Sequence, residues 1–95
     1  MPKAACFEVA GVDLRFDPSD HLPPHFHAER AREWAVRVFF LSDPKKMIQV
    51  EYSNRKNRPH VSDLKEIVKQ AAAHRIELYM QWQAVVNVTT RGPER

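Results

Sequence analysis

The stretch HFHAERAREWAVRVFF, residues 25–40, gives the strongest indication of the fold, because it contains two strand-like runs joined by a short polar turn. Side chains of a β-strand alternate between its two faces, so every second residue shares a face. In the second run the apolar side chains follow this period: Trp34, Val36, Val38 and Phe40. We therefore predict an antiparallel hairpin of residues 25–30 and 33–40 around Ala31-Arg32.

Two further strands are predicted on either side of this hairpin. In residues 7–16 the apolar positions change from odd to even near Gly11, which indicates a bulge or tight bend at Ala10-Gly11. Residues 47–52 alternate through Ile48, Val50 and Tyr52. The sequence thus predicts four strands in succession.

The rest of the chain favours a helix. Asp63, followed three residues later by Glu66, resembles a capping box at a helix start. Apolar residues then recur at helical spacing: Leu64, Ile67, Val68, Ala71, Leu78, Trp82 and Val85. A helix of this length is long for the domain, so a break near Ala73–Arg75 is predicted.

The fold class expected from these patterns is α+β, with an antiparallel four-stranded meander sheet packed on one C-terminal helix or on its two halves. Residues 1–87 are predicted to form a single domain, and residues 88–95 a disordered tail.

Composition narrows the functional classes. The chain has 95 residues and a formal net charge of +3, so an acidic partner or a nucleic acid is compatible with it. The single cysteine, Cys6, excludes an internal disulfide and a zinc centre built on thiolates. No segment is apolar and long enough for a membrane span or a secretory signal, and a cytoplasmic protein is expected.

Histidines and prolines are concentrated just before the hairpin, in DHLPPHFH (20–27). Together with the helical stretch HRIEL (74–78) and Trp82, this motif resembles a bacterial family known as domain of unknown function 4160. The match covers roughly residues 7–84. Members of that family are often encoded beside another small protein, in an arrangement similar to a toxin–antitoxin pair. The resemblance implies a cognate partner from an adjacent gene, and it implies no activity, cofactor or catalytic residue.

This chain departs from the family in two places. Family members usually carry a glycine in the turn after the histidines, where this chain has Arg30-Ala31-Arg32-Glu33. The C-terminal tail also differs from the usual one.

The histidine run admits a metal site. On a strand, His25 and His27 point to the same face, as does Glu29. His21 or Asp20 from the preceding loop can complete a ligand set. Three protein ligands with one open position suit zinc or a similar divalent metal, the one cofactor that the sequence admits.

Metal-free acid–base chemistry is the alternative, in the form of a small ribonuclease. His25 and His27 can act as base and acid on an RNA 2′-hydroxyl and a leaving 5′-oxygen. Arg37, or the loop Arg55–Arg58, can hold the phosphate. In the structural interpretation these histidines only bond backbone carbonyls near the prolines.

The hairpin register separates these interpretations. A loop with an even number of residues places His25 and His27 on the face of Trp34, against the core. A loop with an odd number places them on the other face, with Ala35 and Arg37. A face away from the core favours a functional site.

Two other features suggest binding. Arg55, Lys56 and Arg58 form a basic loop, which is a nucleic-acid contact or simply a solvated turn. Phe39 and Phe40 are adjacent, so one of them must leave the single-sided core and can serve a docking surface, including that of a homodimer. His60 is expected to be a loop or capping residue, and His74 a solvated residue on the helix surface.

The function expected overall is an interaction module of a toxin–antitoxin-like pair, with a histidine-based or metal-assisted ribonuclease as the alternative.

Overall fold

The computed structural model describes residues 3–4, 6–17, 22–54 and 56–90, with side chains described as far as Val86. It has a four-stranded antiparallel sheet in the order β1-β2-β3-β4 and two C-terminal helices, which confirms the predicted α+β class. The strands are β1 (Asp13–Arg15), β2 (Phe26–Arg30), β3 (Trp34–Val38) and β4 (Ile48–Ser53). A short 3-10 helix, η1 (Pro44–Lys46), precedes β4, and the helices are α1 (Val61–Ala73) and α2 (Arg75–Thr90).

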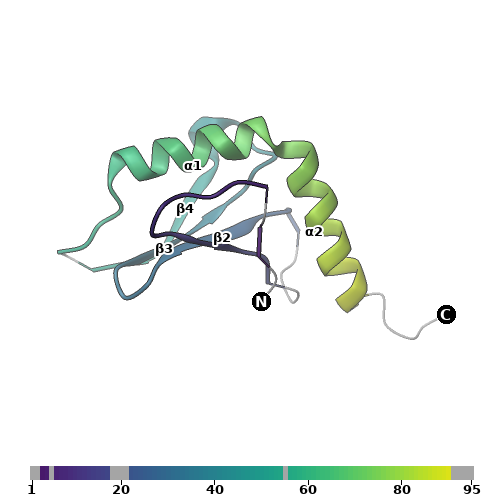
Figure 1. The fold of residues 1–95 in the computed structure, drawn as a ribbon, viewed down its shortest axis with the longest axis horizontal. Helices are drawn as coiled ribbons and strands as arrows, with labels where there is room; N and C mark the ends of the chain where they lie inside the picture. Colours follow the sequence, from purple (N-terminus) through teal and green to yellow (C-terminus); the bar gives the residue numbers. More distant parts are fainter. Residues whose placement is uncertain (1–2, 5, 18–21, 55, 91–95) are drawn as a thin grey trace.

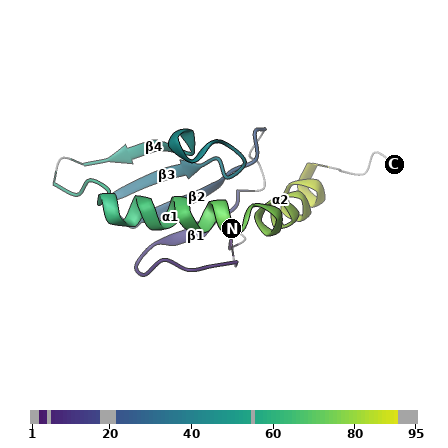
Figure 2. The ribbon, with the colours of Figure 1, turned by 90° about the horizontal axis from the view of Figure 1, so that it is seen from above.

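The two helices are placed differently on the sheet. α1 runs across one face of the sheet, and α2 turns away at its end (Figures 1 and 2). The break falls at His74, as predicted near Ala73–Arg75.

His74 is packed at the end of α1. Its ring stacks on Phe7 and its Nδ1 donates to the carbonyl of Gln70, so the prediction of a merely solvated residue was wrong. α2 reaches Thr90, beyond the predicted domain end at residue 87, and residues 91–95 lie outside the described part.

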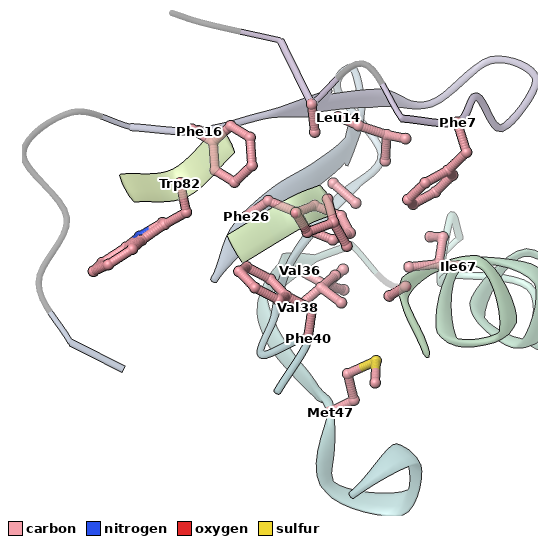
Figure 3. Close-up of a cluster of buried hydrophobic side chains, with 14 of the residues drawn as sticks. Phe7, Leu14, Phe16, Phe26, Val36, Val38, Phe40, Met47, Ile67 and Trp82 are labelled. Carbon is pink, nitrogen blue, oxygen red and sulfur yellow. The ribbon is translucent and has the colours of Figure 1, made fainter. Parts of the chain in front are cut away.

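The core lies between the sheet and the helices (Figure 3). Phe26 is fully buried at its centre, with the rings of Phe7, Phe16 and Phe40 at centroid distances of 6.0, 6.5 and 6.2 Å. The helices contribute buried side chains at the predicted spacing: Ile67, Ala71, Leu78 and Trp82. These positions face the sheet because residues three or four apart share one side of a helix.

The N-terminal strand is shorter than predicted. Only Asp13–Arg15 forms β1, and residues 9–12 form a tight turn closed by the Val12 amide donating to the Val9 carbonyl at 3.0 Å. Gly11 has a φ of +75°, which favours glycine. The guanidinium of Arg30 occupies the space where a Cβ at position 11 would lie. The predicted tight bend at Ala10-Gly11 is therefore confirmed.

The predicted capping box at Asp63 was wrong. α1 begins three residues earlier than a cap at Asp63 would require, with His60 at the N-cap position and no side-chain cap hydrogen bond. Asp63 instead accepts from Arg30 at 3.2 Å, and Glu66 accepts from the Gln70 side chain at 2.7 Å. Both carboxylates have closer partners than the helix N-terminus, so the local pattern is overridden by tertiary and helix-surface contacts.

The hairpin turn also differs from the prediction of a turn around Ala31-Arg32 alone. β2 ends at Arg30 and β3 begins at Trp34, which leaves the three residues Ala31 to Glu33 in the loop. The Glu33 amide donates to the Arg30 carbonyl at 2.9 Å, and Arg32 has a φ of 69°. A four-residue turn with positive φ at its third position favours glycine there.

Replacing Arg32 with glycine is expected to raise the free energy of unfolding by about 0.5 to 1 kcal/mol. The left-handed backbone costs a non-glycine residue about 1 to 2 kcal/mol, and glycine removes this strain. The greater conformational entropy of glycine in the unfolded state offsets part of the gain. Urea unfolding measures the change. Ala31→Gly in the same turn is the control, and its φ is not positive, so it should destabilise slightly. Equal effects of the two variants would contradict the assigned turn.

Candidate functional site

The hairpin register answers the question left open by the sequence. His27 pairs with Arg37 and Glu29 with Ala35, while Ala28 pairs with Val36. Because the loop has an odd number of residues, His25 and His27 share the face with Arg37, which is the face away from α1. We term this helix-free side the open face.

His25 and His27 occupy this face in different ways. His25 is only 5% exposed, and the centroid of its ring lies 5.1 Å from the ring centroids of both His27 and Phe39. Its Nδ1 is 2.9 Å from the Pro23 carbonyl, which can only accept, so Nδ1 carries the proton. Phe40 is buried in the core, so Phe39 is the adjacent aromatic that leaves it, as predicted for one of the pair.

His27 on β2 contacts a carboxylate from β4, two strands away on the same face of the sheet. Its Nδ1 lies 3.0 Å from Oε1 of Glu51, and Nε of Arg37 donates to Oε2 of the same carboxylate at 3.1 Å. Burial alone would raise the pKa of Glu51, but the hydrogen bonds and charges of His27 and Arg37 outweigh it and lower the pKa overall. The ionised carboxylate fixes His27 as the tautomer with its proton on Nδ1.

A second carboxylate continues the cluster toward β1. Glu29 accepts from the Tyr52 hydroxyl at 2.8 Å and from Arg15 at 2.7 Å. The hydrogen bonds from Tyr52 and Arg15 lower the pKa of Glu29. The pKa of both Glu29 and Glu51 is lower in the folded state than in the unfolded state, so their ionised carboxylates stabilise the fold. This stabilisation is complete when the pH is above the unfolded-state pKa, and it is lost as the pH falls through the folded-state pKa.

A bulge in β4 makes this cluster possible. Ala35 pairs with Tyr52 but Val36 pairs with Val50, so Glu51 is an extra residue on β4. The bulge interrupts the predicted alternation of Ile48, Val50 and Tyr52, and that part of the prediction was wrong. Tyr52 instead faces Glu29 on the open face, beside Glu51.

The hydroxyl of Tyr52 should titrate above the ordinary tyrosine range, because losing its proton would place two anions together. Its hydrogen bond to Glu29 raises the pKa of Tyr52. Absorbance titration at 295 nm, with Tyr79→Phe as background, measures this group alone. Glu29→Gln is expected to lower the pKa of Tyr52, whereas Glu8→Gln, at an exposed carboxylate elsewhere, should leave it unchanged. The same titration curve for all three proteins would contradict the Glu29–Tyr52 contact.

The structure brings together some of the predicted site residues. His25, His27 and Arg37 are neighbours on the open face, as the ribonuclease alternative requires. Asp20 and His21, predicted as metal ligands with the two histidines, lie outside the described residues, as does Arg55. Within the described ranges, no group of three His, Cys, Asp or Glu residues is arranged to hold a metal ion.

Asn54 binds the part of the basic loop that the structure describes. Its side-chain oxygen accepts from the amides of Lys56 and Asn57 at 3.0 and 2.7 Å, and its amide nitrogen donates to the Arg32 carbonyl. Lys56 and Arg58 are exposed. The loop therefore lies beside the hairpin turn, away from the His27–Glu51 contact.

Arg15, Glu51 and Tyr52 are the site residues that sequence reasoning missed. Arg15 could have been found, since it lies between the inward-facing Leu14 and Phe16 and must point to the open face. Simple alternation would also turn Glu51 outward, but it places Tyr52 on the core side, and only the bulge at Glu51 brings Tyr52 to the open face.

Comparison of the chain with protein-family models, with curated proteins and with solved structures found no match in any of the three. The resemblance to domain of unknown function 4160 thus stays a prediction. Neither helix, over its described residues, is long and apolar enough to cross a membrane.

Proposed function

We propose that the protein is a small interaction module and that the open face around His27, Arg37 and Glu51 is the surface that contacts its partner. One observation carries this proposal: side chains from all four strands are hydrogen-bonded on the helix-free face, in two neighbouring sets that centre on Glu51 and Glu29. Side chains that are already fixed lose little conformational entropy on binding, so a partner can bind this surface at a lower entropic cost.

The exposure of these side chains agrees with a contact surface. The side chains of Arg37 and Glu51 are 46% and 28% exposed, so their polar atoms remain accessible while their geometry is held. Phe39 is partly exposed beside His25. An aromatic ring next to an oriented arginine is a common composition at the centre of protein interfaces.

The first partner to test is the small protein encoded by the adjacent gene, which the family resemblance suggests. The two chains are co-expressed with a tag on one of them only, and the mixture is run on size-exclusion chromatography. Co-elution as a stoichiometric complex is expected, and Arg37→Glu should separate the two chains. Lys56→Glu, on the basic loop, is the matched control and should leave the complex intact. Separate elution of the wild-type chains would refute this partner.

A second function, RNA cleavage, is favoured by the His27–Glu51 contact. A carboxylate on Nδ1 orients a histidine as a general base, and the His25 ring is 5.1 Å away with Arg37 alongside. If the protein cleaves RNA, His27→Ala should slow cleavage by about 10²- to 10⁴-fold. His60→Ala, at an exposed histidine outside the cluster, should have no effect. Unchanged cleavage in His27→Ala would exclude this function.

A further inference from the structure

A groove with apolar walls lies between α1 and η1. It has a volume of about 530 Å³ and contains both apolar and cationic side chains: Pro44, Lys45, Val61, Leu64, Lys65, Val68 and Lys69. Val61, Leu64 and Val68 are spaced three and four residues apart, so they form one stripe along α1. The groove belongs to the helix side of the sheet and contains no residue of the open face.

Apolar surface on this side of the molecule is left uncovered. Val61 is 67% exposed and Val50 is 52% exposed. Val50 pairs with the buried Val36 on the edge strand β4, so it faces the same side of the sheet as α1. Of the two, Val61 lines the groove, and exposed apolar side chains with a polar rim are typical of interaction sites.

The rim of the groove is cationic on both walls. Lys65 and Lys69 belong to α1 and Lys45 to η1, and all three are exposed. Among the described residues no ion pair joins any of them to a carboxylate, and no acidic side chain lines the groove. A second copy of this chain would bring the same lysines to the contact, and like charges oppose that arrangement.

We infer that this groove binds an amphipathic α-helix of a partner protein, whose apolar stripe is flanked on both sides by Asp or Glu. The stripe from Val61 to Val68 extends about 10 Å, which two turns of a partner helix match. Acidic residues on one flank would meet Lys65 and Lys69, and those on the other flank would meet Lys45. The inference stands independently of the open face, since the two surfaces lie on opposite sides of the sheet.

The test uses a fluorescent, stapled helical peptide of about 18 residues, long enough to hold helical structure. It carries leucines at helical spacing with glutamates on both flanks. A second peptide has lysine at every glutamate, and a third has the same composition as the first in scrambled order. Fluorescence anisotropy with the full chain is expected to show saturable binding of the first peptide alone, weakening with added salt.

Variants of the chain make the result specific. Reversing two rim charges, with Lys65→Glu and Lys69→Glu together, should weaken binding of the glutamate peptide about tenfold or more and permit binding of the lysine peptide. Val61→Ser, at an exposed position, should also weaken binding. Lys56→Glu and Glu51→Ala lie outside the groove and should bind as wild type, which separates this site from the open face.

Two outcomes would overturn the inference. One is equal affinity for the glutamate, lysine and scrambled peptides. The other is unchanged affinity after the double charge reversal, with circular dichroism showing that the variant is folded.

Discussion

Replacing Phe26 with alanine is expected to lower the free energy of unfolding by about 3 to 5 kcal/mol. Phe26 is fully buried and has three aromatic rings around it, from Phe7, Phe16 and Phe40. Truncation removes its burial and leaves a cavity that rings fixed on three different segments cannot fill. A domain of this size is stable by about 5 to 14 kcal/mol, so the variant would be marginal.

Urea unfolding followed by circular dichroism measures this change, with two matched variants. Phe26→Leu retains most of the volume and should cost much less than alanine. Phe39→Ala removes the same side chain from the partly exposed position beside His25, and should cost about 1 to 2 kcal/mol. A loss at Phe39 as large as that at Phe26 would contradict the assignment of the core to the helix side of the sheet.

Replacing Glu51 with alanine is expected to weaken partner binding about 30-fold or more, the effect typical of a central interface residue. The Glu51 carboxylate is the shared acceptor for His27 and Arg37, so its removal releases both side chains from their fixed positions. The effect on the free energy of unfolding should be smaller, about 1 to 2 kcal/mol, because the pair is partly exposed.

Isothermal titration of the partner measures the affinity. Glu8→Ala, at an exposed carboxylate that lies 4.0 Å from the Lys3 amine, is the control and should bind normally. A double-mutant cycle of Glu51→Ala with Arg37→Ala should show coupling, since one contact is removed by either change. Additive effects would contradict the proposed coupling of Glu51 and Arg37 in the interface, and normal binding by Glu51→Ala would show that Glu51 is not part of it.

The fold was predictable because it follows from local periodicity. Alternation in residues 33–40 gave β3, the helical spacing gave α1 and α2, and the phase change at Gly11 gave the turn before β1. The predicted capping box failed at Asp63 because its carboxylate accepts from Arg30 on β2, and a contact with a distant strand is not visible in local sequence. Glu66 instead accepts from Gln70, one turn further along the same helix.

The site was predictable only in part. The histidines and Arg37 could be named, but their face depended on the number of residues in the hairpin loop, which the sequence left open. Arg32 adopts a positive φ although it is not a glycine, so the sequence did not indicate this turn conformation. The bulge at Glu51 is likewise unmarked by glycine or proline, and it determines which β4 side chains reach the histidines.

Chemical-shift mapping of the ¹⁵N-labelled chain with its partner tests the proposed interface most directly. We expect the backbone amide shifts to concentrate on His27, Arg37, Glu51 and their neighbours on the open face. At the same partner concentration, these shifts should be much smaller in Glu51→Ala. Perturbations confined to the basic loop or to the far end of α2, with the open face unchanged at saturation, would contradict the proposed interface.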